Sequence, residues 1–286
     1  MAYVDEGDGP LVVLLHGFPT SSHLWRDLVP ILAPRFRAIA PDLLGYGDSS
    51  RPEDTEALTI RAQARYVREL LQRLGVEEFA VVGHDIGGGV AQLLALEDRV
   101  GALVLLDSIT FDSWPIEAVR MIQAARSEEV DQDFIDKLLD LTFDLGMGDR
   151  GRLVAEDLEE YVRPWREDPM ALVRAARGID GVGLVGTQDQ LAALDTRTLI
   201  VWGEEDPFLP AEQGERLGDL MPGATVAVLP GCSHFVLDDA PEEVTSLVSR
   251  YLRTHYLGER HGHHEAGPTP IELGISFDRP DRLSDD

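Results

Sequence analysis

Short apolar runs alternate with longer amphipathic stretches along most of the chain. The runs are those expected of strands buried on both faces of a parallel sheet, and Tyr3–Asp5 before them is also strand-like. They span Leu11–His16, Arg37–Pro41, Phe79–Gly83, Ala102–Leu106, Thr198–Trp202 and Thr225–Leu229. The intervening periodicity predicts helices at Ser22–Ala33, Ile60–Leu74, Gly88–Ala95, Ala211–Met221 and Pro241–His255. This order indicates an α/β fold with a mostly parallel sheet flanked by helices.

The alternation stops between Phe111 and Thr196, where the pattern is helical and no convincing strand occurs. Helices are predicted at Asp112–Arg126, Gln132–Leu145, Ala155–Arg166 and Asp168–Ala176. A helical insert within a strand–helix order is typical of a lid over one end of the sheet. We therefore divide the chain into a core (residues 1–109 and 197–257), a helical lid (110–196) and a C-terminal tail (258–286). The tail is rich in Gly, Pro, Asp and His, which predicts loose order.

Composition and charge narrow the range of partners. The formal net charge is −27 and Lys137 is the only lysine, so the molecule repels nucleic acid and anionic membranes. No stretch approaches the ~20 apolar residues of a membrane span, and the N-terminus lacks a signal-peptide pattern. Cys232 is the only cysteine, which excludes an internal disulfide. We expect a cytoplasmic monomer or homodimer that binds a small molecule.

The strongest local motif is the pentapeptide Gly83-His84-Asp85-Ile86-Gly87, between a predicted strand and a predicted helix. A tight turn with small residues on both sides lifts the central side chain out at the carboxyl end of a strand, where a nucleophile usually sits. The usual nucleophile in such a turn is serine, whereas here it is Asp85. The alternative interpretation is a glycine-rich turn in which the carboxylate merely favours the helix N-terminus.

Three further motifs follow other predicted strands. In His16-Gly17-Phe18-Pro19, the amide of Phe18 is placed to form an oxyanion hole together with the amide of Ile86. Asp206 follows the first strand after the lid, and His234 follows the last strand. The order nucleophile, acid, histidine predicts a catalytic triad of Asp85, Asp206 and His234.

With these motifs in order, the chain resembles the α/β-hydrolase superfamily from about Tyr3 to His255. The segments His16–Arg26, Pro41–Arg51 and Gly83–Gln92 most resemble haloalkane dehalogenases and epoxide hydrolases. Those families carry an aspartate nucleophile at the position of Asp85. The motifs are specific for the fold and for the type of nucleophile, but they are not specific for the substrate.

The resemblance implies a cofactor-free hydrolase that acts through a covalent alkyl ester of Asp85. His234 would activate the water that hydrolyses the ester, and Asp206 would orient the imidazole. Asp107, which ends the strand before the lid, is the alternative acid, because some haloalkane dehalogenases place theirs there. The implied substrate is a small apolar halogenated compound or epoxide, with a slight preference for the halogenated compound.

The chain departs from those families in the groups that assist the leaving group. Dehalogenases commonly have tryptophan after the nucleophile or asparagine after His-Gly, and here these positions hold Ile86 and Phe18. Trp114, Trp165 and Tyr161 in the lid are the remaining candidates for contact with substrate or leaving group, although each also fits a packing role.

Two other kinds of function stay open at this point. One is an esterase or lactonase in which Asp85 acts as a base on water. The other is a non-hydrolytic lyase or ligand-binding protein on the same scaffold, suggested by the missing donors at Phe18 and Ile86.

The histidines outside the predicted triad do not indicate a metal site. His16 and His84 belong to backbone motifs, where local hydrogen bonds are expected. His261, His263 and His264 lie in the tail without suitably spaced acidic or cysteine partners, which favours a solvated segment. We predict no metal and no cofactor.

Overall fold

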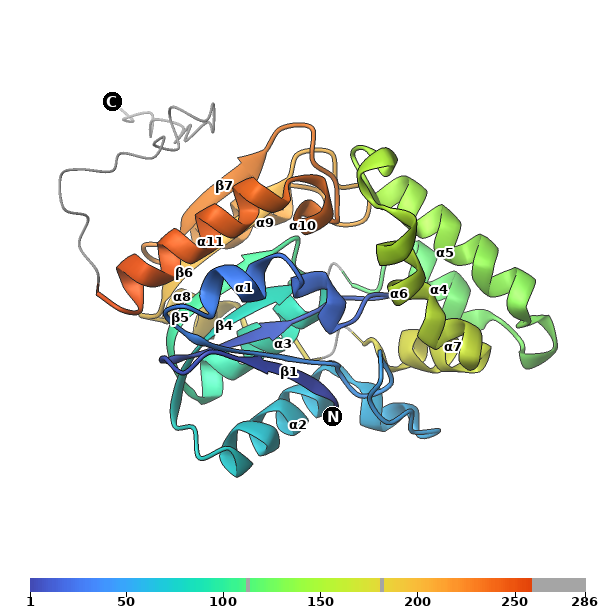
Figure 1. Cartoon of the computed structure of the whole chain (residues 1–286), viewed down its shortest axis with the longest axis horizontal. Helices are drawn as coiled ribbons and strands as arrows, with labels where there is room; N and C mark the ends of the chain where they lie inside the picture. The colour runs from blue at the N-terminus through green and yellow to red at the C-terminus, as the bar shows by residue number, and fades with distance from the viewer. Residues whose placement is uncertain (112–113, 181–182, 259–286) are drawn as a thin grey trace.

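A computed structural model describes residues 1–111, 114–180 and 183–258. In these ranges the chain forms a seven-stranded sheet of order β1-β3-β2-β4-β5-β6-β7 (Figure 1). The strands are β1 (Tyr3–Glu6), β2 (Leu11–Leu15), β3 (Arg37–Pro41), β4 (Glu78–His84), β5 (Arg99–Leu106), β6 (Arg197–Gly203) and β7 (Thr225–Leu229). Neighbouring strands run parallel except for β1, which pairs antiparallel to β3. The six predicted strands are confirmed, but β7 lies at an edge of the sheet and is only partly buried. The strand-like Tyr3–Asp5 lies in the exposed edge strand β1.

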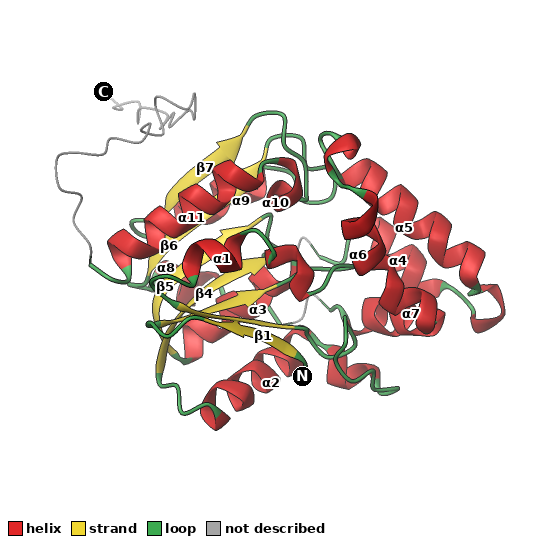
Figure 2. Ribbon diagram, in the orientation of Figure 1, coloured by secondary structure: helices red, strands yellow, loops and turns green. Residues whose placement is uncertain are grey.

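Helices cover both faces of the sheet, which explains why its central strands are almost wholly apolar (Figure 2). On one face α1 (Leu28–Leu32) contacts α11 (Pro241–His255). The other face is covered by four helices, and each of them contacts the next one along the chain. These are α2 (Ile60–Arg73), α3 (Ile86–Glu97), α8 (Gln188–Ala192) and α9 (Glu212–Leu220).

The segment predicted as one helix at Ser22–Ala33 is instead two short elements. A 3-10 turn, η1 (Ser22–Trp25), is capped by the side chain of Ser21, and α1 begins only at Leu28. The break has a local cause, because Pro30 has no N–H to donate to the carbonyl of Arg26 four residues earlier.

Four lid helices lie together at one end of the sheet (Figure 1). They are α4 (Glu117–Ala124), α5 (Gln132–Gly146), α6 (Ala155–Glu167) and α7 (Pro169–Gly178). The predicted helix Asp112–Arg126 is shorter than expected, because Pro115 disfavours helical backbone in the residue before it. Residues 112–113 of that prediction lie outside the described residues, as does the predicted tail beyond Gly258.

The remaining short elements connect the lid, the core and the last helix. They are η2 (Thr55–Leu58), η3 (Ser127–Glu129), η4 (Arg150–Arg152) and α10 (Val236–Asp239). One of them, η2, packs against α7, and the earlier turn η1 packs against α6. None of the helices in the described ranges has the length and apolarity needed to cross a bilayer.

Candidate active site

Asp85 occupies a tight turn between β4 and α3. Its backbone has φ 50° and ψ −118°, a conformation that residues other than glycine rarely adopt. The neighbouring glycines are sterically required, because a Cβ on Gly83 would lie 2.3 Å from the carbonyl oxygen of Gly87. A Cβ on Gly87 would lie 2.1 Å from the carbonyl oxygen of Leu15. The predicted tight turn is therefore present, and the surrounding backbone packs too closely for larger residues at Gly83 and Gly87.

The carboxylate of Asp85 is almost fully buried, with 1% of the residue exposed. Its Oδ2 accepts a hydrogen bond from the amide of Phe18 at 2.8 Å, while Oδ1 has no partner among the described residues. Burial raises the pKa of Asp85 to about 6, although His234 and the amides of Phe18 and Ile86 lower it. The two amides predicted to form an oxyanion hole therefore stabilise the charged form of this carboxylate.

His234 and Asp206 form a buried pair next to Asp85. The Nδ1 of His234 lies 2.8 Å from Oδ2 of Asp206. The other oxygen, Oδ1, accepts from the amides of Phe208 and Leu209 at 2.8 and 2.9 Å, which fixes the carboxylate. Burial lowers the pKa of His234, but Asp206 outweighs it and the net pKa is raised. This geometry orients the imidazole and stabilises its protonated form.

The alternative acid, Asp107, lies at the end of β5 with a different set of contacts. Its Oδ1 accepts a hydrogen bond from the amide of Gly203 at 2.7 Å. Burial, and then the charge of Asp206, raise the pKa of Asp107 well above its ordinary value. No hydrogen bond joins Asp107 to His234 among the described residues, so the geometry favours Asp206 as the partner of the histidine.

Two of the three lid candidates have donors that are already used. The indole N–H of Trp165 donates to the carbonyl of Pro19 at 2.8 Å. The hydroxyl of Tyr161 accepts from Arg26 at 3.0 Å and lies 3.3 Å from the carboxylate of Asp238. Trp114 is also buried, but its indole N–H has no partner among the described residues. Of the three, Trp114 retains a free donor.

The loop after β7 that carries His234 is fixed by His84 and Asp239, and the sequence did not indicate this role for either residue. His84 was expected to bond locally, but its Nε2 donates to the carbonyl of His234, 150 positions away, at 2.8 Å. Asp239 accepts from the amide of Ser233 at 2.8 Å and from Gly148 at 3.0 Å, which ties the loop to the end of α5. Only the sequence position of His84, beside Asp85, could have pointed to such a role.

The comparison with known proteins identifies the family. The sequence pattern of the family described as alpha/beta hydrolase fold matches residues 10–241. The chain belongs to the α/β-hydrolase family. This α/β hydrolase is 30% identical over 262 residues to haloalkane dehalogenase 2 of Mycobacterium bovis, covering 86% of this chain and 89% of that protein. It is 33% identical over 278 residues to a soluble epoxide hydrolase of a Corynebacterium species, covering 88% and 93%.

A solved structure agrees with this assignment. An α/β-hydrolase-fold protein from Burkholderia ambifaria superposes with a TM-score of 0.80 at 27% identity, covering 86% of this chain and 92% of that one. The chain is therefore an enzyme of the hydrolase type with dehalogenase and epoxide hydrolase relatives.

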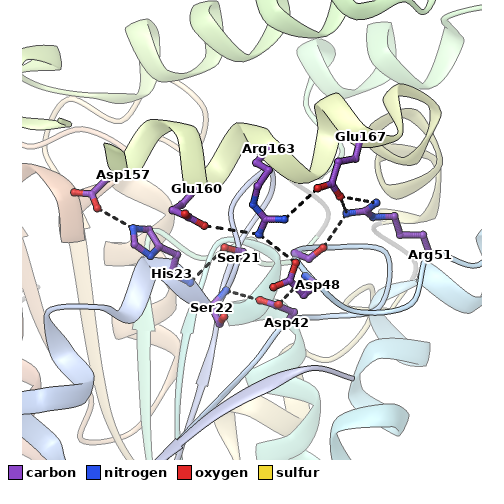
Figure 3. A network of polar contacts seen from close by, with 11 residues as sticks. Ser21, Ser22, His23, Asp42, Asp48, Arg51, Asp157, Glu160, Arg163 and Glu167 are labelled. Atoms are coloured by element: carbon purple, nitrogen blue, oxygen red, sulfur yellow. Dashed lines mark hydrogen bonds and ion pairs between the residues drawn. The ribbon is translucent and has the colours of Figure 1, made fainter. Parts of the chain in front are cut away.

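In this α/β hydrolase, α6 is joined to the core by a seam of charged side chains (Figure 3). Asp157 accepts from Nε2 of His23 at 2.8 Å, and Arg163 donates to Asp48 at 3.1 Å. Arg51 pairs with Glu167 at 3.4 Å. A cleft lies along the seam, and neither Asp85 nor His234 lines it.

The histidines of the hydrolase core do not form a metal site. The two ring nitrogens of His16 are engaged by the carbonyl of Gly17 and the amide of Leu43, both at 3.0 Å. No cluster of three or more His, Cys, Asp or Glu residues suited to a metal ion occurs in the described part of the chain. His261, His263 and His264 lie outside that part.

Proposed function

We propose that this α/β hydrolase cleaves a small, neutral, apolar halogenated compound or epoxide through a covalent ester of Asp85, with a preference for the halogenated compound. One observation carries the proposal. The buried carboxylate of Asp85 sits in the nucleophile turn with Oδ2 bound by the amide of Phe18 and with Oδ1 unpartnered among the described residues. A carboxylate held in this way has one oxygen fixed and the other available to attack carbon.

In the first step, Oδ1 of Asp85 attacks a saturated carbon of the substrate. A carbon–oxygen bond forms, the bond to the leaving group breaks, and its electron pair departs with the leaving group. Oδ2 becomes the carbonyl oxygen of the ester while it stays beside the amides of Phe18 and Ile86. The enzyme therefore needs no rearrangement of the oxyanion hole between the two steps.

In the second step, water attacks the carbonyl carbon of the ester. Nε2 of His234 takes the proton from water, because Nδ1 is held by Asp206. The negative charge that develops on Oδ2 is stabilised by the two amides, each typically worth ~2.7–4 kcal/mol. Collapse of this intermediate breaks the bond to the alkoxide, which takes the proton from His234 and leaves as an alcohol. The carboxyl group of Asp85 then loses its remaining proton to solvent, which regenerates the carboxylate.

The electrostatics of the site support a neutral substrate. Among the described residues, the charges that act most on Asp85 are His234, which lowers its pKa, and Asp206, which raises it. A substrate carboxylate would meet two buried acids and only one imidazole, so repulsion in this low-dielectric site disfavours haloacids.

The nature of the leaving group supports the preference for a halogenated compound. A halide departs with hydrogen bonds alone, whereas an alkoxide needs an acid. The hydroxyl of Tyr161 is committed to Arg26 and Asp238, while the indole N–H of Trp114 is free among the described residues. Both a haloalkane dehalogenase and a soluble epoxide hydrolase are among the relatives, so both classes belong in a test.

The proposal is tested by trapping the ester. The variant His234→Ala is incubated separately with haloalkanes, haloacids and epoxides. The peptide that contains Asp85 is expected to gain the mass of the alkyl group from a haloalkane or of the whole molecule from an epoxide, and to gain no mass from a haloacid. The matched control, Asp85→Asn in the same background, is expected to gain no mass. If His234→Ala gains no mass with any haloalkane or epoxide, the ester mechanism is wrong.

A further inference from the structure

Tyr46 is a buried tyrosine whose hydroxyl transfers no proton in the formation or the hydrolysis of the Asp85 ester. It lies in the loop after β3, where its amide donates to the carbonyl of Leu43 at 3.0 Å. Only 1% of the residue is exposed, and its hydroxyl has no partner among the described residues. A buried hydroxyl without a partner is unfavourable, and such a group in a native protein calls for an explanation.

The ring of Tyr46 is fixed against the residues that surround Asp85. It packs edge-on against His16 at 5.3 Å, against Trp165 at 5.5 Å and against Phe18 at 6.4 Å between ring centroids. Phe18 donates its amide to Asp85, and Trp165 is anchored by its own hydrogen bond to Pro19. Tyr46 therefore belongs to the wall of the same site and has little freedom to move.

The phenol of Tyr46 also responds to the charge of Asp85. Burial, and then the charge of Asp85, raise the pKa of Tyr46 well above its ordinary value. Tyr161 provides a contrast, because it is equally buried but its hydroxyl is committed to Arg26 and Asp238. Of these two tyrosines, Tyr46 is the one with a hydroxyl available to a substrate beside Asp85.

We propose that Tyr46 is a further catalytic residue, whose hydroxyl donates a hydrogen bond to the halide that departs when Asp85 attacks. This inference rests on the proposed function and adds a donor from the core loop rather than from the lid. The carbon–halogen bond breaks, its electron pair leaves on the halide, and the halide accepts the hydrogen bond. Tyr46 keeps its proton throughout, so no further acid or base is required. A phenol that holds its proton tightly suits this role.

The test compares leaving groups in the trapping background. Formation of the Asp85 adduct is timed in His234→Ala and in His234→Ala/Tyr46→Phe with 1-chlorobutane, 1-bromobutane and 1-iodobutane. Loss of the hydroxyl is expected to slow adduct formation about 10- to 100-fold for chloride, the range of a hydrogen bond to a charged group. The loss should decrease from chloride to iodide, because smaller halides accept stronger hydrogen bonds.

Equal slowing for all three halides, or no slowing, would overturn the role of Tyr46 while the ester mechanism stands. If His234→Ala forms no adduct with these three halides, the role of Tyr46 is overturned. The proposed function fails as well only if the wider set of haloalkanes and epoxides also gives no adduct. Tyr161→Phe is the matched control, since it removes a hydroxyl that is committed to Arg26 and Asp238, and its effect should not depend on the halide. The same comparison is repeated with His234 intact, by measuring the rate of the initial burst of halide release in the wild type and in Tyr46→Phe.

Thermal unfolding of the single variant provides a second, independent measurement. Tyr46→Phe is expected to melt at or above the temperature of the wild type, because it removes a buried hydroxyl without a partner. Tyr161→Phe is expected to melt lower, because it breaks the contacts to Arg26 and Asp238. A clear drop for Tyr46→Phe would mean that the hydroxyl is already bonded in the resting protein, which contradicts its proposed role.

Discussion

Asp85 combines three features that are unfavourable for folding. Its backbone has a positive φ, its carboxylate is buried, and one of its oxygens lacks a partner among the described residues. Each feature destabilises the native state to some degree, and features of this kind cluster at active sites. The cause of the strain is local, since Gly83 and Gly87 allow the close packing that forces the turn.

Replacing Asp85 by asparagine should therefore stabilise the protein at neutral pH. The pKa of Asp85 is raised from 3.8 to about 6, so the stability contributed by its protonated form is full below pH 3.8 and lost as pH rises through 6. At pH 8 Asp85→Asn should unfold with up to about 3 kcal/mol more free energy than the wild type. The difference, measured by urea unfolding, should shrink at pH 4. A destabilised variant at pH 8 would contradict this.

The pH dependence of alkylation follows from the same group. Only the ionised form of Asp85 attacks carbon. The rate of adduct formation in His234→Ala should therefore rise tenfold per pH unit below the pKa of Asp85 and reach a plateau above it. The half-maximal rate should fall at or above pH 6, because burial raises the pKa of Asp85 and the variant lacks the histidine that lowers it. Stopped-time mass spectrometry between pH 4.5 and 8.5 measures this profile. A rate independent of pH over this range would show that ionisation of Asp85 does not limit the attack.

The sequence alone predicted which residues meet at the site but not which donors remain available. Asp85, Asp206 and His234 each follow a strand, and parallel strands bring their carboxyl ends to one edge. The sequence could not show that the indole N–H of Trp165 is already used, because the carbonyl that accepts it belongs to Pro19, 146 positions away in a loop. The contact of His84 with the backbone of His234 depends in the same way on tertiary packing.

At the scale of elements, α6 ties the lid to the core beside the site through both packing and ion pairs. Trp165 on this helix packs on Phe18 and Tyr46. Asp157 on the same helix pairs with Arg26 and with His23, and Figure 3 shows the contact with His23. Because Asp85 is buried, a substrate reaches it only if some part of the surrounding structure moves. The ion pairs of α6 are partly exposed, so each contributes little alone and the group acts as a salt-sensitive seam.

Neutralising Asp157 should loosen α6. In Asp157→Asn, backbone amides of Ala155–Glu167 are expected to exchange hydrogen about 2- to 5-fold faster, in line with the loss of up to about 1 kcal/mol from partly exposed ion pairs. Glu156→Gln removes the same charge from the neighbouring, exposed position and serves as the control. Hydrogen exchange with mass spectrometry measures both. Equal exchange in the two variants would mean that the seam does not hold the helix.

Periodicity predicted the existence of most elements but not all of their ends. Most strands and several helices match within a few residues, because burial on both faces or on one stripe sets their pattern. The divided helix at Ser22–Trp25 and Leu28–Leu32 was missed, since the apolar spacing continues across the break that Pro30 imposes. The shortened α4 was missed for a related reason, the proline at position 115.

At the scale of the whole molecule, the dominant property is a net charge of −27. Self-repulsion among surface carboxylates opposes the compact state, and salt screens it, since the Debye length falls from about 10 Å at 0.1 M to about 3 Å at 1 M. The melting temperature should therefore rise by roughly 3–6 °C from 0.05 to 1 M NaCl, equivalent to about 1–2 kcal/mol. Calorimetry in NaCl and in KCl, which screen equally, checks this. A falling melting temperature would show that surface ion pairs outweigh the repulsion.

The central claim about the whole enzyme is that the oxygen atom added to the substrate comes from the carboxylate of Asp85, and that water replaces this atom in Asp85 afterwards. A single turnover with enzyme in excess, run in water enriched in oxygen-18, tests it most directly. The account predicts that the alcohol product of the first turnover carries unlabelled oxygen from Asp85, and that the label appears in the peptide containing Asp85. Labelled product in the first turnover, with an unlabelled Asp85 peptide, would contradict the account.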